Sequence, residues 1–137
     1  MSAREEQEVL FANEAFYRAF GDRDLHAMDA LWSRENPVAC VHPGWGALVG
    51  RGAVLESWAS LLANPRSPTP ACRAPRAFVC GAAAFVICFE ELEGNFLLAT
   101  NVFVREKSAW RMVHHQSGPT ADRPAPEETP SDRGPVH

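Results

Sequence analysis

The sequence has none of the cysteine patterns that define metal-binding or disulfide-rich proteins. Four cysteines stand at positions 40, 72, 80 and 88, and no two of them form a Cys-x-x-Cys pair. The usual zinc-ligand spacing is therefore missing, and we expect no metal site. We also expect no disulfide framework, because 137 residues can bury a sizeable core without one. Cys80 and Cys88 lie in apolar runs and are interpreted as core residues, whereas Cys72 lies in a proline-rich loop as a candidate free thiol.

Basic charge and long hydrophobic runs are also scarce. The 13 lysines and arginines are outnumbered by 17 acidic residues, which gives a formal net charge of −4. Such a balance argues against a surface for nucleic acid or an anionic membrane. No apolar run approaches the ~20 residues that cross a bilayer. The charged start, Met1-Ser-Ala-Arg-Glu-Glu-Gln-Glu8, has no apolar signal region, so we expect a cytoplasmic protein with reduced thiols.

Two common catalytic signatures are missing as well. Gly44-Trp-Gly46 lacks the further glycines and the lysine of a phosphate-binding loop. No serine lies in a nucleophile-elbow motif. We therefore expect no cofactor, and any chemistry must come from ordinary side chains.

The first half of the chain carries helical patterns. Apolar residues at spacings of three and four predict helices over 5–20, 24–32 and 53–62. A short apolar strand is predicted over 38–42, ending in a histidine. We therefore expect three helices and one short strand in the first 62 residues.

The second half changes to extended chain. Residues 64–75 carry four prolines, which predict a surface connection or an irregular edge strand. Runs rich in β-branched and aromatic residues then predict four strands, over 76–80, 83–92, 96–105 and 110–117. Helices followed by consecutive hairpins predict an α+β domain with the helices on one face of the sheet.

The ends of the chain differ in composition. Residues 1–118 are expected to form one domain. Residues 119–137 are rich in proline and acidic residues with little to bury, so they are expected to form a disordered tail. The strand over Ala83–Phe89 is apolar on both faces, so the sheet face without helices is expected to be covered by a partner subunit.

Polar side chains interrupt the last predicted hairpin. Asn101 lies in its first strand, and His114 and His115 lie in its second. A two-residue turn at Lys107-Ser108 predicts that Asn101 pairs with His114 on one face, with His115 on the other. A one-residue shift would exchange those faces. In either case the two histidines point to opposite faces, so at most one belongs to an internal pocket.

These residues define a candidate site. His114 or His115 could act as a general base, because histidine titrates near neutral pH, while Asn101 could orient a carbonyl or hydroxyl. The alternative is that they satisfy one another in the core. His42 precedes the tight stretch Pro43-Gly44-Trp45, which suits the rim of a cavity. The alternative there is that Trp45 fills the core.

In their order along the chain, several short motifs resemble those of SnoaL-like members of the nuclear transport factor 2-like superfamily. The resemblance covers roughly residues 5–118 and rests on the following segments: Phe11-Ala-Asn-Glu-Ala-Phe-Tyr17, Asp24-Leu-His-Ala-Met-Asp-Ala-Leu-Trp32, Cys40-Val-His-Pro-Gly-Trp45, Gly50-Arg-Gly52, Ser57-Trp58, Thr100-Asn-Val-Phe103 and Trp110-Arg-Met-Val-His-His-Gln-Ser117. It implies a cone, in which a curved antiparallel or mixed sheet wraps over about three N-terminal helices around an internal pocket. It also implies a homodimer formed through the outer sheet face.

The resemblance also implies a kind of function. The superfamily includes ketosteroid isomerases, scytalone dehydratase, limonene epoxide hydrolase, polyketide cyclases and non-catalytic members. No pocket aspartate matches the isomerases and cyclases; scytalone dehydratase, which uses histidines with an aspartate, is nearer. The expected catalytic residues are His42, His114 and His115. The expected ligand-binding residues are the following five: Trp32, Trp45, Trp58, Asn101 and Phe103.

Two functions remain open from the sequence. The first is a small-molecule binder or cofactor-independent enzyme of isomerase, dehydratase or hydrolase type, which acts on an apolar oxygenated ligand. The second is a non-catalytic dimeric module for ligand binding or assembly. An open cavity with converging polar groups favours the first, and a cavity plugged by a tryptophan such as Trp45 or Trp58 favours the second.

Overall fold

The chain folds as three helices packed against one open, mixed sheet. The computed structural model describes residues 3–126. The helices are α1 (Ala3–Gly21), α2 (Leu25–Leu31) and α3 (Arg51–Ala63). The strands, in chain order, are β1 (Ala39–Val41), β2 (Leu48–Val49), β3 (Ala71–Cys80), β4 (Ala83–Leu92), β5 (Asn95–Glu106) and β6 (Ala109–Pro119). The predicted α+β fold class, with its helices and long strands, is confirmed.

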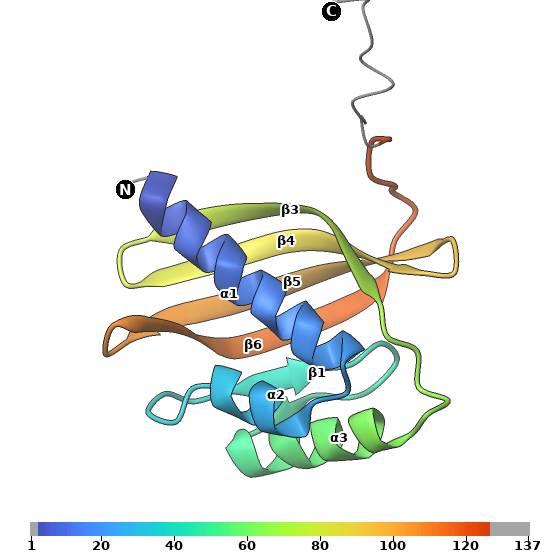
Figure 1. The fold of residues 1–137 in the computed structure, drawn as a ribbon, viewed down its shortest axis with the longest axis horizontal. Helices are drawn as coiled ribbons and strands as arrows, with labels where there is room; N and C mark the ends of the chain where they lie inside the picture. The colour runs from blue at the N-terminus through green and yellow to red at the C-terminus, as the bar shows by residue number, and fades with distance from the viewer. Residues whose placement is uncertain (1–2, 127–137) are drawn as a thin grey trace, which may run out of the picture.

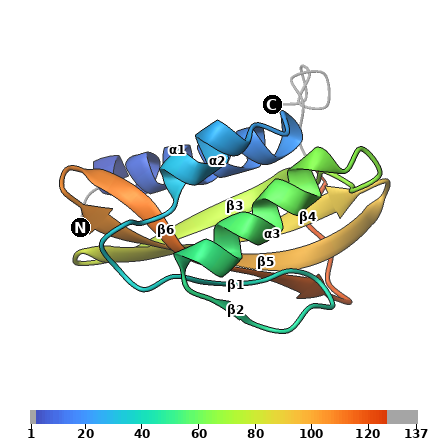
Figure 2. The same cartoon turned by 90° about the horizontal axis from the view of Figure 1, so that it is seen from below.

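The four long strands form a meander to which the two short strands are added. The strand order is β2-β1-β6-β5-β4-β3. Only β1 and β6 pair in parallel among the strands of residues 3–126, and the other neighbours are antiparallel. Figure 1 shows α1 lying diagonally across one face of β3–β6, with α2 and α3 beside β1. Figure 2 shows the sheet curving beneath the helices.

The core lies between α1, α3 and the inner face of the sheet. Phe16 of α1 and Trp58 of α3 are both fully buried, and their rings meet edge to face at 5.5 Å. Val86 and Phe103 cover them from β4 and β5. Burying such large aromatic and aliphatic side chains is the main favourable term for a domain of this size. No helix within residues 3–126 is long and apolar enough to span a membrane.

A bulge in β6 decides which histidine faces the core. The turn at Lys107-Ser108 gives the predicted pairs nearest to it, and Phe103 lies opposite Met112. The register then shifts by one residue, so Val102 lies opposite His114 and Asn101 lies opposite His115. The predicted pairing of Asn101 with His114 is therefore wrong. The reason is an extra residue inside the strand, which the turn does not reveal.

The proline-rich stretch predicted over residues 64–75 overlaps the start of strand β3. β3 begins at Ala71 and contains a register shift between Arg73 and Arg76, so the stretch is an irregular edge strand from that point. Cys80 is exposed at the far end of β3, which corrects its interpretation as a core residue, whereas Cys88 is buried as predicted. Pro119 still belongs to β6. Of the tail predicted over 119–137, residues 127–137 lie outside the described residues.

Candidate active site

A cavity of about 230 Å³ opens between the end of α1, the loop after β1 and the connection from α3 to β3. Its wall is mostly apolar and contains three titratable side chains, His42, Glu90 and His115. The apolar and hydroxyl residues of the wall are Phe20, Pro43, Trp45, Leu61, Ser67, Pro68, Pro70, Leu92 and Leu97. Trp45 is 45% exposed, so it stands at the mouth and does not plug the core. An apolar cavity with a few converging polar groups is the usual form of a small-molecule site.

His115 projects from β6 into the core side of the sheet. It is 1% exposed, and its Nδ1 lies 2.6 Å from Asn101 Oδ1. The Asn101 amide nitrogen donates to Asn13 Oδ1 at 2.8 Å and to the Tyr17 hydroxyl at 3.1 Å. Asn101 Oδ1 is thus an acceptor, so the proton of the neutral imidazole sits on Nδ1. The other nitrogen, Nε2, carries a lone pair.

Glu90 supplies a buried carboxyl group next to that lone pair. It projects from β4, is 2% exposed, and holds Oε2 at 3.8 Å from His115 Nε2. The Tyr17 hydroxyl donates to Oε2 and the Ser117 hydroxyl donates to Oε1, each at 2.7 Å. Burial raises the pKa of Glu90, and the two hydroxyl donors oppose that rise. The carboxyl of Glu90 therefore holds its proton more tightly than the carboxyl of an exposed glutamate does.

Burial has the opposite effect on the two cavity histidines. The pKa of His115 is lowered to about 3, mainly by burial and further by the neighbouring His42 and His114. Burial lowers the pKa of His42 to about 4. Both rings are therefore neutral at neutral pH, and His115 can accept a proton.

His42, which directly follows β1, also lines the cavity. Its Nε2 lies 2.9 Å from Ser57 Oγ, whose own hydrogen goes to the Val54 carbonyl at 2.6 Å. The serine oxygen therefore accepts from His42, which leaves His42 Nδ1 as the unprotonated nitrogen. The His42 ring meets the rings of Trp45 and Trp58 edge to face, each at 4.8 Å. These contacts hold the His42 imidazole ring in place next to Trp45 at the cavity opening.

The structure brings only some of the expected site residues together. His42, His115 and Trp45 line the cavity, and Asn101 binds His115 from behind. Trp58 contacts the rings of His42 and His115 from the core without lining the cavity. Two residues expected at the ligand, Trp32 and Phe103, are buried elsewhere in the core.

His114 lies apart from these groups. It points to the outer face of the sheet, where its Nδ1 lies 3.0 Å from the Ala39 carbonyl oxygen. Its contact is therefore with the β1 backbone, while the neighbouring His115 faces the cavity.

Sequence reasoning missed the acidic member of the site and its supports. Glu90 follows Ala84, Val86 and Cys88 at alternate positions of β4, all of them buried. The alternation of burial is seen only in the structure, because residues Ala83–Phe89 are apolar on both faces and the sequence pattern does not say which face Glu90 takes. Asn13 and Tyr17 are four residues apart on the buried stripe of α1, a spacing that places both on one side of the helix.

The chemically active groups of the cavity wall are the side chains of His42, Glu90 and His115. No group of three histidine, cysteine, aspartate or glutamate side chains that could hold a metal ion occurs within the described part of the chain. What the arrangement can do is accept a proton at His115 Nε2 and donate one from Glu90, across a distance of 3.8 Å.

Comparison with known proteins gives a consistent fold family. The SnoaL-like domain family matches residues 9–122. A proposed dehydratase of the NTF2-like family from Streptomyces avermitilis is 32% identical, with 87% of this chain and 98% of that chain covered and a TM-score of 0.78. A proposed calcium/calmodulin-dependent protein kinase type II association domain from Thiobacillus denitrificans is 34% identical, with 80% and 92% covered and a TM-score of 0.71.

A curated relative is longer than this chain. The F-box protein SKIP8 of Arabidopsis thaliana is 28% identical over 111 residues, which are 80% of this chain and 48% of that protein. The chain thus spans about half the length of this relative.

Proposed function

This chain belongs to the SnoaL-like domain family, as its motifs predicted, and we propose that it is a cofactor-independent enzyme that dehydrates a small β-hydroxycarbonyl compound. The observation that carries the proposal is the neutral His115 ring, with its Nε2 lone pair 3.8 Å from the buried Glu90 carboxyl in an apolar cavity. The likeness to a protein named as a proposed dehydratase agrees with it.

In this elimination, His115 acts as the general base and Glu90 acts as the general acid. His115 Nε2 takes the proton from the carbon next to the carbonyl of the ligand. The electron pair of that C–H bond forms the new double bond, and the hydroxyl group leaves with the proton of Glu90 as water. His115 is then cationic and Glu90 is anionic, and this ion pair at 3.8 Å offsets the low basicity that burial gives to His115. Transfer of the proton from His115 to Glu90 restores the starting state.

The cavity limits the ligand. Its volume of about 230 Å³ is below the ~300–1,000 Å³ of most drug-sized sites, so the ligand is small. Its apolar wall, formed in part by Leu61, Leu92 and Leu97, favours a hydrocarbon body with oxygen atoms at one end. Such a ligand is of the apolar, oxygenated kind that the sequence analysis expected, and it remains part of this proposal.

Proton exchange in deuterium oxide tests the proposal without knowledge of the natural ligand. A panel of small β-hydroxyketones is incubated with the protein, and ¹H NMR follows loss of the α-proton signal and growth of alkene signals. His115→Gln should lower both rates by about 10²–10⁴-fold, the usual contribution of an acid–base group. Glu90→Gln should retain α-proton exchange and lose alkene formation.

The control is His26→Gln, which removes an exposed histidine of α2 and should leave both rates unchanged. Unchanged rates in His115→Gln, or a wild-type protein that binds the compounds with no exchange, would contradict the proposal. The latter result would instead support a non-catalytic ligand-binding module.

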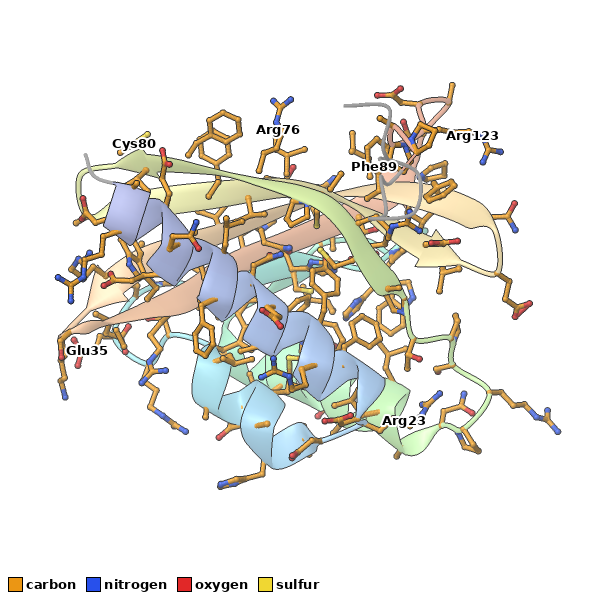
Figure 3. The ribbon with its side chains drawn as sticks, turned by 45° about the horizontal axis from the view of Figure 1, so that its top comes forward. Arg23, Glu35, Arg76, Cys80, Phe89 and Arg123 are labelled. Atoms are coloured by element: carbon orange, nitrogen blue, oxygen red, sulfur yellow. The ribbon has the colours of Figure 1, made fainter. Side chains whose placement is uncertain are left out.

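The second part of the proposal is a homodimer formed through the outer face of the sheet. Figure 1 shows α1 on one face, and among the described residues no helix covers the other face. The rings of Phe78 and Phe85 stack there at 4.8 Å. Those of Phe89 and Phe96 meet at 6.1 Å, and Figure 3 shows Phe89 on this side with Arg76 and Arg123. These two half-buried aromatic pairs on a sheet face without helices support an interface there.

Light scattering with size exclusion tests the dimer. Val102 lies at the centre of the outer face, opposite Phe85 and His114. Val102→Glu should therefore convert a dimer into a monomer. Phe11→Glu is the matched control, because Phe11 is 66% exposed on α1, which lies on the other face of the sheet. A monomeric wild-type protein, or a Val102→Glu variant that stays dimeric, would contradict this part of the proposal.

A further inference from the structure

Two cysteines lie together on the inner side of the sheet, beside α1. Cys72 is on the edge strand β3, where its Cα partner is Glu90, two residues from Cys88. The register of β3 shifts just after Cys72, between Arg73 and Arg76, and Ala74 has a φ of +52° within that shift. A bulge of this kind bends a strand and redirects its side chains. Because directly paired residues share a face and β4 alternates, the side chains of Cys72 and Cys88 lie on the same face of the sheet, diagonal to each other across β3 and β4.

The sulfur atoms are surrounded by hydrogen-bond donors. The Asn13 amide donates to Cys72 Sγ at 3.6 Å. The Tyr17 oxygen, 3.3 Å from Cys88 Sγ, accepts from the Cys88 thiol, because the Tyr17 hydrogen goes to Glu90. The Asn101 amide donates to Cys88 Sγ at 3.9 Å. Donors of this kind favour a thiolate over a thiol, and the thiolate is the reactive form of cysteine.

The two thiols differ in ionisation. The hydrogen bond from Cys88 is the main cause that lowers the pKa of Cys72, although burial opposes it. The same hydrogen bond, together with burial, raises the pKa of Cys88. Cys72 is therefore the partner that forms a thiolate, with Cys88 as its neutral neighbour.

The two thiols also differ in access. Cys72 is half-buried and forms part of the wall of a second cavity, of about 430 Å³, between α1 and β3. Asn13, Tyr17 and Pro75 line the same cavity. Cys88 is 1% exposed behind them. A small oxidant can thus reach Cys72 before it reaches Cys88.

We propose that Cys72 and Cys88 form a redox pair in which a hydroperoxide oxidises Cys72 and Cys88 then closes an intramolecular disulfide. The Cys72 thiolate attacks one oxygen of hydrogen peroxide, the O–O bond breaks, and hydroxide leaves to become water. Cys72 is then a sulfenic acid. The Cys88 sulfur attacks the Cys72 sulfur and loses its proton, the S–O bond breaks, and a second water leaves. Two thiols are oxidised by two electrons, and one peroxide is reduced to two waters.

The arrangement matches what such a pair requires. An accessible thiol of lowered pKa beside a second, resolving cysteine is the usual form of a redox-sensing site. The buried Cys88 sulfur also contacts the Tyr17 hydroxyl, which binds Glu90. If the proposed function is correct, the disulfide would withdraw that sulfur from the acid of the active site, but the redox pair itself does not depend on that function.

Peptide mapping after oxidation tests the pair in the full chain. The folded protein is treated with an equimolar amount of hydrogen peroxide, its free thiols are blocked with N-ethylmaleimide, and the digest is analysed by mass spectrometry. A peptide pair joined through Cys72 and Cys88 should appear, and dithiothreitol should remove it. Cys72→Ser should abolish the cross-link. Cys80→Ser is the matched control and should retain it, because Cys80 is an exposed thiol at the other end of β3 (Figure 3).

Dimedone labelling tests the order of the two steps. In Cys88→Ala, which cannot close the disulfide, peroxide should leave a sulfenic acid on Cys72 that dimedone traps. If this variant does not fold, the mapping of the wild-type protein still decides the proposal. Cross-links that join Cys40 or Cys80 in place of Cys72, a wild-type protein that keeps Cys72 reduced, or a Cys72–Cys88 link that forms only in urea would each overturn it.

Discussion

At the scale of single residues, Asn101 controls the protonation of His115. Its Oδ1 accepts from His115 Nδ1 at 2.6 Å, and its amide nitrogen donates to Asn13 and Tyr17. Asn101→Asp places a carboxylate at the same distance from the ring. That charge favours the imidazolium, so the pKa of His115 should rise from about 3 toward its ordinary value of 6.5. NMR titration of the His115 ring measures the shift.

Asn101→Leu serves as the control for this charge effect. It removes the same hydrogen bonds and adds no charge, so the pKa of His115 should stay low. Both variants leave buried partners unpaired, and each such group destabilises the fold by about 1–3 kcal/mol. An equal rise of the pKa in both variants would show that the lost hydrogen bonds, and not the carboxylate, set the titration of His115.

The residues of the site could be predicted from the sequence only where they broke an expected pattern. His42, His115 and Asn101 stand out because they are polar within apolar strands. Glu90 does not stand out in the same way, because the adjacent Glu91 makes it resemble the solvent-facing end of a strand. Which of His114 and His115 faces inward depends on the bulge in β6, and that is set by packing across the sheet.

At the scale of elements, Arg23 joins the turn after α1 to the connection that forms the cavity rim. Its guanidinium donates to the Asn64 carbonyl at 2.7 Å, to the Leu61 and Pro65 carbonyls at 3.4 Å, and to the Ser67 carbonyl (Figure 3). These groups include the Leu61 carbonyl in the last turn of α3 and the carbonyl of its C-cap, Asn64. Ser67 and the residues after it line the cavity.

Arg23→Ala should loosen this connection. Hydrogen exchange at Asn64, Arg66 and Ser67 should become faster, and the free energy of unfolding should fall by about 1–2 kcal/mol, since charged donors to carbonyls are lost. Arg18→Ala is the control, because Arg18 pairs with Glu14 on the exposed side of α1, where such pairs contribute about 0.5 kcal/mol or less. Local exchange rates equal to those of the wild type would show that the connection is held by its prolines.

The elements themselves were predictable to the extent that periodicity defines them. The helices and β4–β6 were placed within about two residues of their bounds, since each carries a full apolar stripe or alternation. β2 has two residues and no pattern of its own. The start of β3 was left open between a surface connection and an irregular edge strand, because it contains Pro75 and a bulge, features that sequence rules confine to irregular or edge positions.

At the scale of the whole molecule, burial of neutral histidines links folding to pH. The pKa values of His42 and His115 are lowered from 6.5 to about 4 and about 3 in the folded protein. Below pH 6.5 the unfolded chain binds protons that the folded chain does not. Their contribution to stability is therefore present above pH 6.5, and it is lost as the pH falls toward the folded values. Each histidine can contribute up to about 1.4 kcal/mol per pH unit in that window.

Glu90 acts in the opposite direction. Its pKa is raised above 4.5 in the folded protein, so its contribution is present below pH 4.5 and is lost as the pH rises through the folded value. The free energy of unfolding of the wild-type protein should consequently rise between pH 4.5 and 6.5. The rise per pH unit should be smaller than His42 and His115 alone would give, because Glu90 opposes it. Urea unfolding across this range should show a steeper slope for Glu90→Gln, which removes the opposing carboxyl, and a shallower slope for His42→Asn. If neither variant changes the slope, titratable groups outside the cavity govern the stability in acid. Glu90→Gln and His42→Asn remove groups whose contributions depend on pH in opposite directions, so at least one of them should change the slope.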